Sequence, residues 1–195
     1  MITIDIERMQ GRLGVKQDGV AGPVTFAALF GAMGASGAMA AELGLAAAVH
    51  VPAYGIFETG LRLAHFMTQT AHESDSFRTM EEYASGAAYE GRADIGNVQA
   101  GDGVRYKGRG PLQLTGRANY RAFGRALGID FESHPEIVAL PSIGLLVACK
   151  YWADKGLNAW ADADDIVNAT RRINGGLNGL DDRKRQLVVA KGLIL

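Results

Sequence analysis

Two glutamates nine positions apart, Glu73 and Glu82, are the residues whose type and spacing best suit catalysis. Glu73 follows Phe66 by seven residues and Thr70 by three, so on a helix it continues the stripe that these two form. A carboxyl group at the edge of an apolar stripe favours the protonated form that a general acid needs. Glu82 lies past the expected helix end, where we expect more water and an ionised carboxylate. Such a pair suits glycosidic hydrolysis, although the spacing alone favours two solvated helix carboxylates.

A second run, from Tyr106 to Tyr120, is rich in groups that can bind a polar ligand. Its glycines at 108 and 110 allow a tight backbone and the close approach of a ligand. Amide, hydroxyl and aromatic groups suited to sugar binding follow at Gln113, Thr115, Asn119 and Tyr120. A loop followed by a helix that Thr115 caps is the alternative interpretation.

Histidine and cysteine give no sign of a metal site or of another cofactor. The histidines at 50, 65, 72 and 134 are scattered, with no His-Glu-x-x-His pair and no Cys/His cluster. The single cysteine, Cys149, lies in an apolar run and is expected to be a buried structural thiol. We therefore expect no cofactor.

The composition is that of an ordinary soluble globular protein, with 48% apolar and 21% charged residues. With 20 basic and 21 acidic residues the net charge is −1, which argues against a nucleic-acid partner. The start of the chain has no signal-peptide pattern. The Ala/Gly-rich stretch from Ala32 to Val51 contains Glu42 and His50 and predicts a loosely packed helix or linker, so no membrane insertion is expected.

The elements that must position these residues are helices, because strand patterns are poor throughout. Apolar periodicity predicts a helix around 63–71, one from Pro141 to near Gly156, one that starts after Asp162 to Asp165 and stops at Asn174, and a last one capped by Asp181 or Asp182. Residues 84–111 lack such periodicity and predict a long functional loop. We expect an all-α protein in three parts: a small unit over 1–35, a connector over 36–50 and a helical domain over 51–195.

Several of these motifs occur together in one family. The motifs are His72-Glu73-Ser74, Glu82, the run from Gly108 to Thr115, Asn119-Tyr120 and the run from Arg171 to Gly179. Together they resemble the family 19 glycoside hydrolases, which contain chitinases and phage endolysins, and the chain looks most like the endolysin branch. The resemblance covers roughly residues 52 to 190.

The resemblance implies a lysozyme-like, two-lobed fold with a substrate cleft and an inverting mechanism. It implies that Glu73 is the acid, Glu82 the base, and Thr115 the hydroxyl that helps to hold the attacking water. The residues that it implies contact sugar or shape the cleft are Gln113, Asn119, Tyr120 and Asn174. Asp75 and Ser76 stand where relatives usually have glycines, and the loop after Glu82 differs from that of relatives. These two differences leave the choice between Glu81 and Glu82 open.

The N-terminal unit has its own pattern, from Leu13-Gly14-Val15 to Ala28-Leu29, with turn glycines at 19 and 22. It is similar to about half of a small helical peptidoglycan-binding domain. An N-terminal helical hairpin that packs on the catalytic domain is the alternative.

These features predict an endolysin-type glycosidase that cuts β-1,4 bonds of peptidoglycan strands and lyses bacteria. The alternatives are a chitinase, a lytic transglycosylase that needs only one acid, and a wall-binding protein without activity. We expect a monomer made in the cytoplasm of a bacterial host without a signal peptide. Such a protein reaches the wall after a separate protein has permeabilised the membrane.

Overall fold

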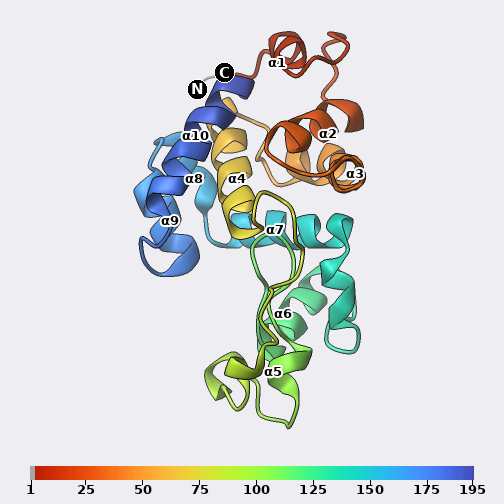
Figure 1. The fold of residues 1–195 in the computed structure, drawn as a ribbon, viewed down its shortest axis with the longest axis vertical. Coiled ribbons are helices and arrows are strands. Elements are labelled where there is room, and N and C mark those ends of the chain that lie inside the picture. Colours follow the sequence, from red (N-terminus) through yellow and green to blue (C-terminus); the bar gives the residue numbers. More distant parts are fainter. Residues whose placement is uncertain (1–2) are drawn as a thin grey trace.

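The computed structural model describes residues 3–195, and over that range the fold is almost entirely helical (Figure 1). Extended pairing in the described residues is limited to two isolated bridges, which join Arg109 to Glu81 and to Leu114. The α-helices are α1 (Ile6–Arg12), α2 (Pro23–Ala32), α3 (Gly37–Ala53), α4 (Gly60–Glu73), α5 (Asp102–Arg105), α6 (Arg117–Leu127), α7 (Pro141–Asp154), α8 (Leu157–Asp162), α9 (Ile166–Asn174) and α10 (Leu180–Ile194). Three short 3-10 helices are η1 (Ala87–Tyr89), η2 (Ala93–Ile95) and η3 (Pro135–Ala139). The predicted all-α class is confirmed.

Helix α4 runs through the larger of two hydrophobic cores. The side chain of Thr59 accepts a hydrogen bond from the Arg62 amide and caps the start of the helix. From Leu63 to Ala71 every residue of α4 is buried, which places the predicted stripe inside the protein. Helix α10 packs along α4, and both contribute to this core (Figure 1).

The predicted connector is a packed helix. Residues 37–53 form α3, which lies against α2 and α7 and buries Leu43, Ala47 and Val51. Its small residues let two helices approach closely, because a Cβ at Gly44 would lie only 2.6 Å from the carbonyl oxygen of Pro23 in α2. The Ala/Gly-rich composition therefore reflects tight helix packing and is no sign of a flexible link.

The N-terminal helices share the core of the rest of the chain. Met9, Phe26, Leu29 and Phe30 are fully buried in the same cluster as α4, α7 and α10. In Figure 1, α2 and α3 stack on each other beside α4. An N-terminal hairpin that packs on the rest of the chain, which the sequence left as an alternative, agrees with this arrangement, whereas wall binding by residues 1–35 stays a prediction.

A second, smaller core defines the other lobe. It contains Tyr106, Leu114, Tyr120, Phe131 and Val138, and Val147 from α7 completes it. Helix α7 therefore contributes to both cores, since Leu145, Cys149 and Trp152 lie in the larger one. The buried position of Cys149 agrees with the structural role expected of it, and burial raises the pKa of its thiol.

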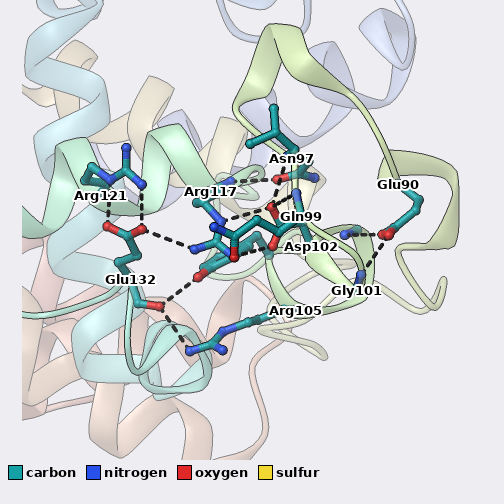
Figure 2. A network of polar contacts seen from close by, with 12 residues as sticks. Glu90, Asn97, Gln99, Gly101, Asp102, Arg105, Arg117, Arg121 and Glu132 are labelled. Carbon is teal, nitrogen blue, oxygen red and sulfur yellow. Dashed lines mark hydrogen bonds and ion pairs between the residues drawn. The ribbon is translucent and has the colours of Figure 1, made fainter.

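A network of polar contacts fixes the long 84–111 segment on this lobe (Figure 2). Arg117, at the start of α6, donates to the buried Asp102 carboxylate with an Nε–Oδ2 distance of 2.9 Å, and it also pairs with Glu132. This contact lowers the pKa of Asp102. The Glu90 carboxylate accepts the amides of Gly101 and Gly103 at 2.7 and 2.8 Å. The segment has little regular structure, as predicted, but these contacts give it a defined course.

The helix boundaries mostly follow the sequence signals. Asp165 caps α9, whose last residue is Asn174, and α7 begins at Pro141, as predicted. The predicted cap of the last helix is wrong, because Gly179 caps α10 and Asp182 lies in its first turn. No helix in the part of the chain that the structure describes is long and apolar enough to span a membrane.

Candidate active site

Glu73 is the last residue of α4 and lies half-buried in the wall of a cleft, with 21% of its side chain exposed. The Glu73 Oε1 atom accepts from the guanidinium of Arg183, which is 1% exposed on α10 and also donates to Gln69. The sequence placed Glu73 at the edge of an apolar stripe. In the structure its carboxylate instead contacts a buried cation that lies 110 positions along the chain.

The residue before it, His72, is held in the same way. Its Nδ1 lies 2.7 Å from the Oδ2 atom of Asp182, which is the neighbour of Arg183 on α10. A Cβ at Gly179 would lie 2.3 Å from the His72 ring, so only glycine fits there. Two adjacent contacts therefore join the end of α4 to the start of α10, and His72 has a structural role there.

The cleft has a volume of about 690 Å³ and is lined by both lobes. Glu73 and Asn174 lie at the ends of α4 and α9, which pack on the larger core, and Gln113, Thr115 and Asn119 lie in and just before α6, beside the smaller core. The structure thus brings five of the seven predicted site residues to one cavity. The other lining residues include Tyr89, Arg92, Tyr151, Lys155 and Arg172. Of these, only Arg172 belongs to a motif that the sequence had indicated.

The backbone and local hydrogen bonds fix the position of the polar side chains that the smaller lobe contributes to the cleft. Gln113 has a left-handed backbone with φ 53°, and its side-chain amide donates to the Gly110 carbonyl at 3.0 Å. The Thr115 hydroxyl donates to the Gln113 carbonyl at 2.9 Å, and the Asn119 amide donates to the Thr115 carbonyl at 2.7 Å. The Gln113 side chain lies close to the backbone of Gly108, since a Cβ built on Gly108 would lie 2.5 Å from its Oε1 atom. Gly116, and not Thr115, caps α6.

The two adjacent glutamates have different surroundings. Glu81 Oε1 accepts from Arg109 Nε at 2.9 Å and lies 3.3 Å from Lys107 Nζ, so two cations occupy this carboxylate. Among residues 3–195, Glu82 has no cation within 4.0 Å. Its Oε2 accepts from the Tyr89 hydroxyl at 3.0 Å, and its Oε1 is buried without a partner in the described residues. This difference favours Glu82 as the second reactive carboxylate.

Glu82 is more enclosed than its place beside a glycine-rich loop indicated. It is half-buried and does not line the cleft itself, but its partner Tyr89 does. Burial, and then the contact with the Glu82 carboxylate, raise the pKa of Tyr89. The buried Asn97 holds the Tyr89 carbonyl at 3.0 Å and accepts from the Arg117 amide at 2.8 Å. Asn97 thereby ties Tyr89 to the start of α6.

Tyr120 does not line the cleft. Of the two roles that the resemblance implies, contact with sugar or shaping the cleft, its position agrees with the second. Its side chain is fully buried, and its hydroxyl donates to the Lys107 carbonyl at 2.8 Å and accepts from Arg109 at 3.1 Å. Burial raises its pKa to about 12. Tyr120 packs in the core of the smaller lobe and supports the strand-like segment around Arg109.

The part of the cleft wall that is formed by the end of α7 and by α9 carries two cations. Lys155 caps the C-terminus of α7 and Arg172 lies in the last turn of α9, where the Arg172 Nε donates to the Lys155 carbonyl at 3.3 Å. Neither side chain has a carboxylate within 4.0 Å among residues 3–195, whereas Asp154 beside them pairs with Lys150. Asn174 accepts the Gly176 amide at 2.9 Å and donates to the Asn178 carbonyl at 3.0 Å, which shapes the loop next to them.

A helical, two-lobed fold with a carboxyl group at a helix end in the interlobe cleft defines the lysozyme-like class of proteins. Within that class the chain belongs to glycoside hydrolase family 19, since the family model described as chitinase class I matches residues 30–171.

Individual relatives agree with this family. A glycosyl hydrolase family 19 domain-containing protein of Haemophilus influenzae is 42% identical over 102 residues, which are 52% of this chain and 49% of the relative. An endochitinase of Arabidopsis thaliana is 34% identical over 134 residues, 68% of this chain and 45% of the relative. The chain thus spans about half the length of these curated relatives.

Solved structures show the same fold. Chitinase C from Streptomyces griseus matches with a TM-score of 0.71 and 22% identity, over 90% of this chain and 94% of that chain. A class IV chitinase from Zea mays matches with a TM-score of 0.66 and 22% identity, over 88% and 90% of the two chains.

Proposed function

We propose that this protein hydrolyses β-1,4 glycosidic bonds of bacterial peptidoglycan and acts as an endolysin-type glycosidase. Glu73 protonates the leaving oxygen from the cleft wall. Glu82 activates water from the opposite side, and Thr115 helps to orient that water. Membership of glycoside hydrolase family 19 supports the reaction class, and the collection of Glu73, Gln113, Thr115 and Asn119 in one cleft supports the roles of these residues.

The observation that carries the choice of peptidoglycan is the pair of cations in the cleft. Peptidoglycan bears carboxylates on its stem peptides, whereas chitin is uncharged. Lys155 and Arg172 line the cleft and have no acidic partner among the described residues, so they are available to an anionic substrate. Positive charges at helix C-termini also stabilise the helices, but that role does not require Lys155 and Arg172 to face the cleft.

A chitinase is the second candidate, because several relatives carry chitinase or endochitinase in their names. The two substrates are separated by replacing Lys155 and Arg172 with glutamine. Each exposed charge contact is worth about 0.5–1 kcal/mol, so each change should raise KM for peptidoglycan about 2–5-fold. Turnover of a neutral chitooligosaccharide should not change. Control variants are Arg171→Gln, on the same helix outside the cleft, and Lys184→Gln, which is exposed on α10.

Hydrolysis of purified peptidoglycan by the wild-type protein, with the cation dependence just described, is the expected result. Turnover of chitooligosaccharide alone would replace the proposal with a chitinase. Cleavage that leaves anhydro sugar ends would replace it with a transglycosylase. We further propose that the protein works as a monomer and reaches the wall from the host cytoplasm after a separate protein has permeabilised the membrane.

A further inference from the structure

The turn that follows Glu73 has an unusual backbone. Asp75, Ser76 and Phe77 all have positive φ angles, of 50°, 57° and 61°. Residues other than glycine rarely adopt this left-handed region, and they do so mostly as single residues. Three in succession form a strained segment that begins two residues after the end of α4. Such a segment persists only where the surrounding structure holds it.

Part of that support comes from the turn itself. The Ser76 amide donates to the Ala71 carbonyl at 2.7 Å, and the Phe77 amide donates to the Ser74 hydroxyl at 3.1 Å. The Ser74 hydroxyl in turn donates to the Thr70 carbonyl at 2.6 Å. These bonds link the turn to the last turn of α4, so a shift of the turn also shifts the backbone that carries Glu73.

The rest of the support comes from the end of α2. The ring of Phe30 meets that of Phe77 edge to face, with centroids 5.0 Å apart and an interplanar angle of 86°, and both rings are fully buried. Just beyond α2, a Cβ built on Gly34 would lie 2.8 Å from the Ser76 Cβ. The segment 30–34 therefore packs directly against two of the three left-handed residues.

We propose that segment 30–34 is a positioning element for Glu73, and that Phe30 and Gly34 act by holding the left-handed turn in place. Within the N-terminal helices, only segment 30–34 then supports Glu73. The test must distinguish this role from that of an independent wall-binding unit. The inference rests on the proposed role of Glu73 as the acid. A displacement of about 1 Å at such a group can lower turnover on the order of 10²-fold.

The first test compares Phe30→Ala with Phe26→Ala. Both rings are fully buried in α2, but the ring of Phe26 pairs with that of Phe57, with centroids 5.5 Å apart, whereas the ring of Phe30 pairs with that of Phe77 in the turn. We expect kcat on a soluble oligosaccharide to fall at least about tenfold in Phe30→Ala with KM unchanged, while Phe26→Ala, with a similar loss of stability, keeps its kcat. Adding Asp75→Gly and Ser76→Gly to Phe30→Ala should restore much of the kcat, because glycine adopts a left-handed backbone without strain.

The second test needs no large core deletion. Gly34→Ala places a Cβ against Ser76 at a position with φ 112°, whereas Gly31→Ala, on the exposed side of α2, meets nothing within 4 Å. Amide hydrogen exchange at Ser76 and Phe77 should accelerate in Gly34→Ala and Phe30→Ala, and should not in the Gly31→Ala and Phe26→Ala controls. This measurement reports on the turn whatever the substrate is.

Equal losses of kcat in Phe30→Ala and Phe26→Ala, or exchange that does not change in Phe30→Ala, would overturn the proposal. Weaker binding to purified wall with normal kcat on the soluble oligosaccharide would show a wall-binding unit instead. If exchange accelerates but the wild-type protein cleaves no glycan, the support of the turn stands and the proposed function fails.

Discussion

Replacing Glu81 and Glu82 by glutamine, one at a time, separates a structural carboxylate from a catalytic one. The two residues are neighbours with the same side chain, so size and place in the sequence are matched. Glu82→Gln removes the group that activates water, and loss of a general base typically costs about 10²–10⁴-fold in rate. This loss corresponds to about 2.7–5.4 kcal/mol in the activation free energy. The fold should survive, because the amide oxygen still accepts from the Tyr89 hydroxyl.

Glu81→Gln should have the opposite profile. The change removes the charge that pairs with Arg109 at 2.9 Å and with Lys107 at 3.3 Å. Glu81 is 40% exposed, which weakens the pair, but the Arg109 side chain is 8% exposed and loses its counter-charge. We expect a loss of about 1–3 kcal/mol in the free energy of unfolding, and a fall in Tm of about 2–4 °C for each kcal/mol. Turnover at 25 °C should stay within about threefold of wild type, since a domain with an unfolding free energy of about 5–15 kcal/mol remains folded.

The assay is the initial rate of release of soluble fragments from purified peptidoglycan, together with thermal unfolding of each variant. A Glu81→Gln variant that is inactive at a normal Tm, beside a Glu82→Gln variant that is active, would show that the base has been assigned to the wrong residue. Full activity in both variants would refute a mechanism with two carboxylates.

Three further outcomes follow from the structure. Glu73→Gln should nearly abolish turnover while a pull-down on peptidoglycan still shows binding, and loss of binding would count against its role as the acid. Thr115→Ala should lower the rate less, because its hydroxyl only orients water. Asp102→Asn should cost about 3 kcal/mol of unfolding free energy near neutral pH. Arg117 holds the folded pKa of Asp102 below its unfolded value of about 3.9, so the stability difference between wild type and Asp102→Asn should shrink as the pH falls through the folded pKa. Denaturant titrations at several pH values measure this difference, and a constant difference would disprove the pairing. Tyr120→Phe should lower the unfolding free energy by about 1–3 kcal/mol with KM unchanged, because its hydroxyl bonds lie in the core, and a raised KM would place it in the cleft after all.

The helices that build the cleft could be predicted where apolar periodicity and caps agree. The stripe through Leu63 and Phe66 predicted α4 and placed Glu73 near its end. Pro141 predicted the first residue of α7, and the cap at Asp165 predicted the start of α9. The polar groups of Gln113, Thr115 and Asn119 could also be placed together, because they follow one glycine turn.

Contacts between distant parts of the chain could not be predicted. The pairing of Glu73 with Arg183 joins residues 110 positions apart, and local spacing carries no signal for it. Tyr120 looked like a cleft residue because an aromatic hydroxyl suits sugar as well as it suits a core, and only the tertiary packing decides between them. The α3 helix was predicted as a connector because close helix packing and flexible links share the same small residues, although Ala40, Gly44 and Ala47 follow a helical spacing that indicates a packed face.

The products formed from purified peptidoglycan in water enriched in ¹⁸O test the central claim most directly. After borohydride reduction, mass spectrometry identifies the sugar at each new end and shows whether it has taken up oxygen from water. Hydrolysis assisted by Glu73 and Glu82 predicts reducible ends that carry one ¹⁸O atom, and predicts that Glu73→Gln releases none of them. Anhydro ends without ¹⁸O, or the absence of any soluble fragment, would contradict a peptidoglycan hydrolase with two catalytic carboxylates.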